Sequence, residues 1–210
     1  MVAAGLPLKL LVGLGNPGAE YARTRHNVGW WFVDALAVQY GGRWRREAAQ
    51  QAQLARIRID ESELWLLKPT GFMNRSGAPV AAVANFYRLA AAEVLVAHDD
   101  IDLPPGVCRL KEGGGHGGHN GLRDVIAHIG AAFWRLRFGV GHPGARDLVL
   151  DAVLGRPSAA EQSLIDAALA RARAIVPVLL SAGAQRATHT LHNGNPRAEP
   201  AREPEDPGAG

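Results

Sequence analysis

Five side chains in this sequence could together perform hydrolytic chemistry: His26, Asp99, Asn16, Asn74 and Asn120. A histidine oriented by a carboxylate is a general base near neutral pH, because the carboxylate fixes the ring tautomer and stabilises the imidazolium. Asparagine amides can donate to a developing oxyanion and can hold amide groups of a substrate. No Gly-x-Ser-x-Gly motif offers a serine nucleophile, so the attacking group would be water. The set indicates a hydrolase that needs no metal.

A run of nine residues, Gly113 to Gly121, holds six glycines together with His116, His119 and Asn120. Glycine buries no side chain and loses the most conformational freedom on folding, so such a run is typical of backbone that must approach a ligand closely. Apolar periodicity resumes directly after the run, and helix N-termini favour anions. We therefore expect the run to open a helix at a ligand site, with Asn120 contacting ligand and the two histidines forming wall or support groups.

Other kinds of site would use some of the same residues. His116, His119 and the acidic stretch 98–102 could supply metal ligands, although a glycine-rich loop rarely fixes ligand geometry. Residues 13–18 fit the Gly-x-Gly-x-x-Gly pattern of a dinucleotide site, although Pro17 removes a backbone N–H that a pyrophosphate needs. The net charge of +3 would also permit an RNA-binding module without catalysis.

The elements that must position these residues alternate along the chain. Apolar runs and alternation predict strands at 8–14, 94–97, 107–111 and 134–140, and a hairpin of 51–59 with 64–67. Helical spacing predicts helices at 27–40, 76–88 and 159–180, with a last segment at 184–191. This order predicts an α/β fold: a single domain of three layers in which a twisted, mixed β-sheet carries helices on both faces.

Ligands of such sheets gather beyond the C-terminal ends of the strands. Asn16, Asn74 and Asp99 each follow a predicted strand, and the glycine run follows another after a few residues. The recurrence of polar side chains at strand ends predicts that one edge of the sheet forms the site.

The composition sets the broad class of the protein. With 210 residues and 47% hydrophobic side chains, the chain is long enough for one domain with its own core. The single cysteine, Cys108, excludes an intramolecular disulfide and is predicted to be a packed side chain. The sequence shows no signal-peptide pattern and no run long enough to span a membrane, which predicts a cytoplasmic protein. Residues 195–210, rich in proline and acids, are predicted to be a disordered tail on a domain of residues 1–194.

Five motifs, in order, resemble those of bacterial peptidyl-tRNA hydrolases. They are residues 16–21 with 24–27, 68–74, 98–104, the glycine run through Leu122, and 135–143. The resemblance spans residues 8–192, and five motifs in register are highly specific. It implies a cytoplasmic, monomeric esterase without metal or cofactor, which cuts the ester between peptide and tRNA in peptidyl-tRNA. Its substrates would be translation products released from the ribosome, so that tRNA from aborted translation is recycled.

The resemblance also implies a role for each matching residue. His26 matches the catalytic base, Asp99 the residue that orients it, and Asn16 the residue that discriminates blocked peptidyl-tRNA from free aminoacyl-tRNA. The residues matching substrate-binding positions are Tyr21, Phe72, Asn74 and Asn120, and those matching positions that hold the tRNA backbone are Arg109, Lys111 and Arg137. Arginine and lysine suit that last role, since phosphate contacts dominate nucleic-acid affinity. Two departures are Asp100, where the family commonly has Glu, and Glu112, whose charge lies beside Lys111.

Overall fold

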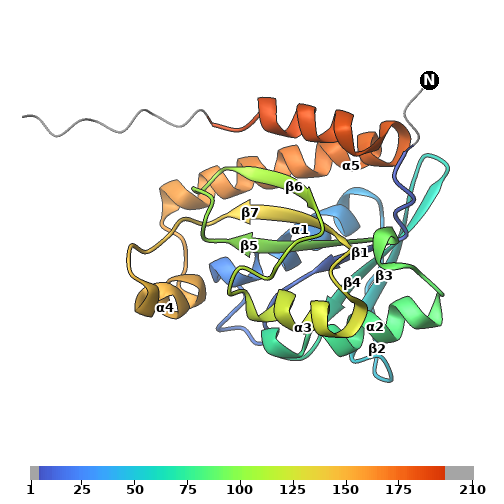
Figure 1. The fold of residues 1–210 in the computed structure, drawn as a ribbon, viewed down its shortest axis with the longest axis horizontal. Helices are drawn as coiled ribbons and strands as arrows, with labels where there is room; N and C mark the ends of the chain where they lie inside the picture. Colours follow the sequence, from blue (N-terminus) through green and yellow to red (C-terminus); the bar gives the residue numbers. More distant parts are fainter. Residues whose placement is uncertain (1–4, 197–210) are drawn as a thin grey trace, which may run out of the picture.

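A mixed sheet of seven strands forms the centre of the protein, seen here in a computed structural model that describes residues 5–196 (Figure 1). The strands are β1 Leu10–Gly13, β2 Arg45–Glu47, β3 Ala52–Ile59, β4 Ser62–Pro69, β5 Val94–Asp100, β6 Cys108–Glu112 and β7 Trp134–Gly139. Their order across the sheet is β2-β3-β4-β1-β5-β7-β6. Most of the predicted tail at 195–210 lies outside the described residues.

The four central strands, β4, β1, β5 and β7, run parallel. Strands β3 and β6 pair antiparallel with β4 and β7, and β2 pairs antiparallel with β3. The C-terminal ends of the parallel strands therefore meet at one edge of the sheet. In register, Gly13 of β1 lies beside Ala97 of β5, and Asp99 of β5 beside Phe138 of β7. Residues that follow β1, β4 and β5 are thus brought to a common edge, as the sequence predicts.

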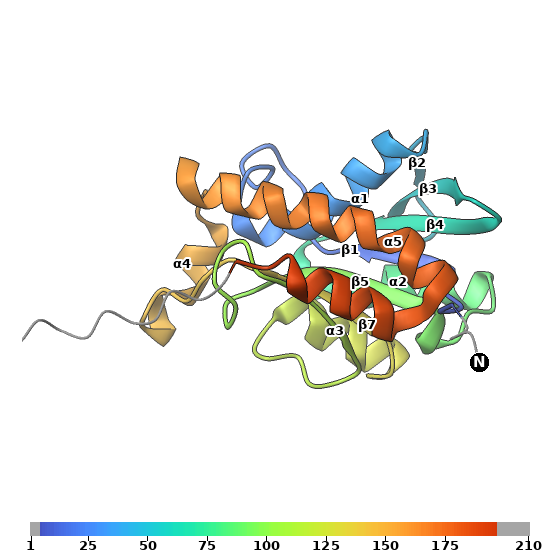
Figure 2. The same ribbon diagram turned by 90° about the horizontal axis from the view of Figure 1, so that it is seen from above.

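Helices cover both faces of this sheet, which confirms the predicted three-layer α/β fold (Figures 1 and 2). The α-helices are α1 Val28–Gln39, α2 Gly77–Phe86, α3 Asn120–Ile129, α4 Val149–Leu154 and α5 Ala159–Asn193, and the 3-10 helices are η1 Arg25–Asn27, η2 Met73–Arg75, η3 Ala91–Glu93 and η4 Arg146–Leu148. Helices α1 and α5 pack on one face, and α2 and α3 on the other. Within residues 5–196, no helix combines the length and the apolar character that crossing a bilayer requires.

The α5 range holds two helical segments, because the backbone at Gly183 is not helical, with φ 80° and ψ 175°. This confirms the two predicted C-terminal helices, 159–180 and 184–191. Two short elements have no counterpart in the predictions. Strand β2 consists of Arg45, Arg46 and Glu47, which offer no apolar alternation, and α4 has only six residues, too few to show a helical period.

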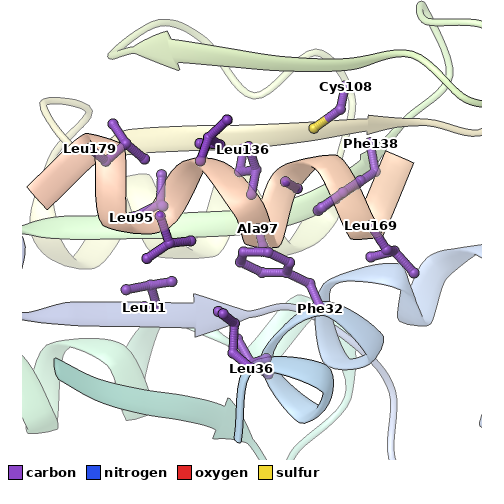
Figure 3. Packing of buried hydrophobic residues seen from close by; sticks show 14 of the residues in the cluster. Leu11, Phe32, Leu36, Leu95, Ala97, Cys108, Leu136, Phe138, Leu169 and Leu179 are labelled. Atoms are coloured by element: carbon purple, nitrogen blue, oxygen red, sulfur yellow. The ribbon is translucent and has the colours of Figure 1, made fainter. Parts of the chain in front are cut away.

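The core lies in two apolar layers, one on each face of the sheet. In the first, Phe32 of α1 lies 5.5 Å from the ring of Phe138 on β7, and Leu169 of α5 is part of the same cluster (Figure 3). Each fully buried side chain of this size contributes about 1.5–3 kcal/mol. Cys108 is buried in this layer, and burial raises the pKa of its thiol, which confirms the packed role predicted for it.

Helix α1 approaches the end of β1 and β5 more closely than side chains would allow. A Cβ at Gly29 would collide with the carbonyl oxygen of Ala97 and lie 2.6 Å from the backbone N and O of Leu14. A Cβ at Gly15 would lie 2.7 Å from the ring of Trp30. Two glycines of the Gly-x-Gly-x-x-Gly pattern, Gly13 and Gly15, are therefore explained by packing against α1, and the third, Gly18, has a positive φ of 110°.

We expect the Gly29→Ala substitution to lower the free energy of unfolding by about 2–3 kcal/mol, because the added methyl group overpacks a backbone contact that cannot relax. Urea unfolding followed by circular dichroism measures this change. The matched control is Gly115→Ala, since a Cβ at Gly115 meets nothing within 4 Å. That variant should stay within about 0.5 kcal/mol of the parent. Equal losses in the two variants would contradict the close-approach explanation.

Candidate active site

His26 lies in η1, between the turn after β1 and the start of α1, and η1 is held by the C-terminal part of the chain. The guanidinium group of Arg25 donates to the carbonyl oxygens of Ala152 and Arg156 at 3.1 and 3.0 Å. It also forms an ion pair of 2.8 Å with Glu161. These bonds anchor η1 to α4 and to the first turn of α5, and so fix the backbone that carries His26.

A buried hydrogen bond of 2.7 Å joins His26 Nδ1 to Asp99 Oδ1 at the end of β5. Asp99 is only 3% exposed. Burial opposes the charged form of Asp99, but the two neighbouring histidines, His26 and His119, outweigh it and hold the pKa of the carboxyl well below its usual range. The carboxylate therefore accepts the bond, Nδ1 of His26 carries the proton, and Nε2 is the ring nitrogen left to act as a base.

The same pair sets the basicity of His26. Burial lowers the pKa of His26, but the charge of Asp99 and its hydrogen bond outweigh burial and raise that pKa above 6.5. The ring is thus a stronger base than a free imidazole.

A second histidine contacts the same carboxylate oxygen. His119 Nε2 lies 2.9 Å from Asp99 Oδ1, and the rings of His119 and His26 are 4.9 Å apart. His119 is the N-cap of α3, so the glycine run does open a helix as predicted. Histidine is not among the preferred N-cap types, which is why the sequence pattern gave no sign of this role.

His98, next to Asp99 on β5, is a third buried ring. Its Nδ1 lies 2.7 Å from the carbonyl oxygen of Asp99, which can only accept, so Nδ1 is the donor. Burial and the neighbouring His119 lower the pKa of His98 to about 3. His98 is therefore uncharged at neutral pH and contributes no charge to the site.

His26 and Asp99 line a cavity of about 840 Å³ at this edge of the sheet. The glycine run and Asn120 form one wall, and Val149, Leu150 and Val153 from α4 line it as well. Lys111 and Arg137 also face the cavity. A buried histidine, the amide of Asn120 and cations thus meet in one space that is large enough for part of a ligand, whereas Asn16 and Asn74 do not line it.

Comparison with known proteins identifies the family of this chain. The family model for peptidyl-tRNA hydrolase matches residues 10–200. The peptidyl-tRNA hydrolase of Acidithiobacillus ferrooxidans is 51% identical over 88% of this chain and 98% of its own length. That of Neisseria meningitidis is 47% identical over 89% of this chain and 97% of its own. The chain belongs to the peptidyl-tRNA hydrolase family.

Solved structures of this family share the fold. The crystal structure of peptidyl-tRNA hydrolase from Acinetobacter baumannii superposes with a TM-score of 0.87 at 45% identity, covering 90% of this chain and 97% of that one. A peptidyl-tRNA hydrolase complex with N-propanol gives 0.89 at 44% identity, covering 92% and 99%.

Asn16, which the resemblance predicts to discriminate between substrates, is buried in a network of hydrogen bonds with Asn27 and Met73, the Asn16 lattice. Its Oδ1 accepts the N–H of Met73 at 2.8 Å, and its own N–H donates to Asn27 Oδ1 at 2.8 Å. Asn27 Nδ2 returns a bond of 3.0 Å to the Asn16 carbonyl oxygen. Because Oδ1 of Asn16 is occupied, its Nδ2 is the group left to donate to a ligand. Asn27 is a supporting residue that the sequence predictions did not assign to the site.

The other residues that match substrate-binding positions of the family lie around this lattice. Asn74 is an exposed residue of η2, one position after Met73. Phe72 is 55% exposed, and its ring lies 6.2 Å from Tyr21 in an edge-to-face pair. Asn120 is separate from them in the chain, yet Gly121 packs so tightly on Met73 that a Cβ there would lie 2.5 Å from the sulfur. The structure thus joins the Asn16 lattice to the wall of the cavity.

The cations form a block on β6, an edge strand of the sheet, and on its neighbour β7. Arg109 of β6 pairs with Arg137 of β7, and Lys111 pairs with Arg135. Arg137 is tied to Asp100 by an ion pair of 2.6 Å. Arg109 is exposed and is not a lining residue of the cavity, so the cation block extends beyond the cavity along the same face of the sheet.

Arg135, which the sequence predictions left without a role, holds the glycine run in place. Its guanidinium group donates to the carbonyl oxygens of Gly114 and Gly115. Sequence motifs did not predict this role, because the partners of Arg135 are backbone oxygens rather than side chains.

His26, Asp99 and His119 also have the composition of a metal site, with donor atoms within 4.8 Å of one another. The bonds of 2.7 and 2.9 Å already use those atoms, so a metal ion would have to displace both ring protons. The geometry favours a hydrogen-bonded triad.

We expect the ring of His26 to titrate above pH 6.5 in the parent protein and below it in Asp99→Asn. Without the carboxylate, only the effect of burial remains, and burial lowers the pKa. Histidine ring signals followed by NMR between pH 4 and pH 9 measure both values, and the exposed His189 serves as an internal control. An unchanged midpoint in Asp99→Asn would contradict the assignment of Asp99 as the charge partner.

Proposed function

We propose that this protein hydrolyses the ester bond between the peptide and the tRNA in peptidyl-tRNA. The observation that carries the proposal is the buried bond of 2.7 Å between His26 and Asp99 beside a cavity that also exposes Asn120 and cations. Family membership over most of the chain supports the same reaction. The reaction needs a base, a site for the peptide and positive charge for the tRNA phosphates. The candidates are His26 for the base, Asn120 for the peptide and the cations for the phosphates.

In the proposed mechanism, Nε2 of His26 removes a proton from water as the oxygen of that water attacks the ester carbonyl carbon. Asp99 keeps the proton on Nδ1 and stabilises the imidazolium that forms. The tetrahedral intermediate then collapses, the bond to the terminal ribose oxygen breaks, and the imidazolium returns its proton to that oxygen. The products are a free peptide carboxyl group and a tRNA with its ribose hydroxyl restored.

Amide groups would recognise the peptide. Nδ2 of Asn16 has no partner among residues 5–196, and Asn120 lines the cavity beside His26. A buried amide donor rewards the carbonyl of a blocked amino group and gives nothing to a free ammonium group. Tyr21, Phe72 and Asn74 would extend this surface along the peptide.

Phosphate groups of the tRNA would meet Lys111, Arg109 and Arg137. Arg137 already neutralises Asp100, so we assign it the smaller share of the contact. On the family resemblance we further propose that the enzyme is a cytoplasmic monomer without a metal, acting on peptidyl-tRNA released from the ribosome.

The first test is hydrolysis of an N-acetyl-aminoacyl-tRNA in the presence of EDTA. We expect full activity in the parent protein and in His189→Ala, an exposed control on α5, and a loss of at least about a thousandfold in kcat for His26→Ala. Full activity in His26→Ala would refute the assigned base. Loss of parent activity with EDTA would indicate a metal hydrolase, and salt-sensitive RNA binding without turnover would indicate a binding module.

A second test concerns selectivity. Asn16→Asp keeps an oxygen that can accept the N–H of Met73, so the lattice should survive, but it replaces the free amide donor by a carboxylate. A carboxylate attracts an ammonium group, so we expect the preference for blocked over unblocked aminoacyl-tRNA to fall about tenfold or more. The ratio of the two kcat/KM values measures this preference. An unchanged ratio would remove Asn16 from substrate recognition.

A further inference from the structure

We propose that His119 is a positioning residue. Its ring joins the helix that carries Asn120 to His26 and Asp99, and it weakens the hydrogen bond between Asp99 and the Nδ1 proton of His26. This inference rests on the proposed function, because it assigns a task within the same site. Three observations carry it: the cap at the start of α3, the shared carboxylate oxygen and the burial of that oxygen.

The hydrogen bonds of His119 fix its tautomer. Nδ1 lies 3.1 Å from the backbone N of Gly121 and 3.2 Å from that of Leu122, and both groups can only donate. Nδ1 is therefore an acceptor, and the ring proton lies on Nε2. That proton points at Asp99 Oδ1, 2.9 Å away, so His119 is a donor to the carboxylate.

Asp99 Oδ1 thus accepts from two rings at once. His26 Nδ1 donates at 2.7 Å and His119 Nε2 at 2.9 Å. A second donor draws electron density from an oxygen that would otherwise act on His26 alone, and the low dielectric of a buried site makes such bonds matter more. His119 consequently weakens the hydrogen bond between Asp99 and the Nδ1 proton of His26. It also supplies the buried carboxylate with a second hydrogen-bond donor.

The same ring also sets the place of Asn120. By accepting the N–H groups of Gly121 and Leu122, His119 satisfies two of the donors that a helix leaves free at its first turn. Asn120 is the next residue in the chain, so its backbone is fixed relative to Asp99 through one side chain. A candidate substrate amide and the catalytic carboxylate are therefore positioned by one group.

Other charged groups face this cluster, and all stay in place in the variants below. The cations are Lys111, Arg123, Arg135 and Arg137. The acids and histidines are Asp100, Asp102, His116 and His142, with the uncharged His98 packed on the ring of His119. Arg25, next to His26 on η1, forms an ion pair with Glu161 of α5. A difference between parent and variant thus reports His119 itself.

The test compares His119→Asn with His119→Ala. Asparagine is a favoured N-cap and can still accept from the start of α3, but it is too short to cap the helix and reach Asp99 together. We expect His119→Asn to keep the thermal midpoint of the parent, and His119→Ala to lower it by a few degrees. In both variants we expect the acidic limb of the kcat/KM profile to move up by about 0.5–1 pH unit, because Asp99 then holds the His26 proton more firmly.

The readout separates positioning from structural support. A loss of activity in His119→Asn with the acidic limb at the parent pH would overturn the proposed effect on His26. An asparagine variant that unfolds as early as the alanine variant would overturn the capping role. Parent activity and parent profile in both variants would remove His119 from the site.

A measurement on the free protein, which needs no hydrolysis, tests this inference separately from the proposed function. Nitrogen-15 NMR of the free protein should show His119 protonated at Nε2 and unprotonated at Nδ1 at pH 8, and His26 titrating at higher pH in His119→Asn than in the parent. If the parent fails to hydrolyse peptidyl-tRNA but these signals appear, the proposed function is wrong and the inference stands. If hydrolysis occurs but His119 carries its proton on Nδ1, the inference is wrong.

Discussion

A buried carboxylate at the end of β5 is the constraint on which the rest of the site depends. An ionised group without water is costly unless donors surround it, and Asp99 finds its donors in His26 and His119. These two rings come from η1 and from the start of α3, which are far apart in the chain. The fold must therefore bring three segments within hydrogen-bond distance at one sheet edge. The parallel arrangement of β1 and β5 does this, because it places the turn after β1 beside the end of β5.

Close approach of backbone makes that convergence possible. Gly29 lets the first turn of α1 rest on Leu14 and on the carbonyl of Ala97, and Gly121 lets the start of α3 rest on Met73. Either position with a side chain would push His26 or His119 away from the carboxylate. The bonds between Asn16, Asn27 and the backbone of Met73 then fasten the β1 turn to η2. The proposed base and the proposed peptide-binding residue Asn16 are thus joined by hydrogen bonds and close backbone packing.

Much of this could be predicted from the sequence, because apolar periodicity and turn residues are local signals. They located the strands around Leu10, Val94 and Trp134, and the strand ends located Asp99. The sequence could not tell which nitrogen of His26 faces Asp99, since that depends on how η1 is seated. It also gave no role to Asn27 or Arg135, because these side chains bind backbone atoms of remote segments. His119 was expected to support the site, but its contact with Asp99 depends on the helix it caps.

Under the proposed function, the cation block would separate affinity from selectivity, because it lies apart from the buried amide of Asn16. Strand pairing forces Arg109 against Arg137 and Lys111 against Arg135, and like charges placed directly opposite each other destabilise a sheet. Two of the four cations have partners that reduce this repulsion: Arg137 forms an ion pair with Asp100, and Arg135 donates to the carbonyl oxygens of Gly114 and Gly115. Arg109 and Lys111 remain exposed. Two solvated cations attract phosphates of any sequence. Under the proposed function, discrimination would come from the buried amide of Asn16, where a missing hydrogen bond cannot be replaced by water.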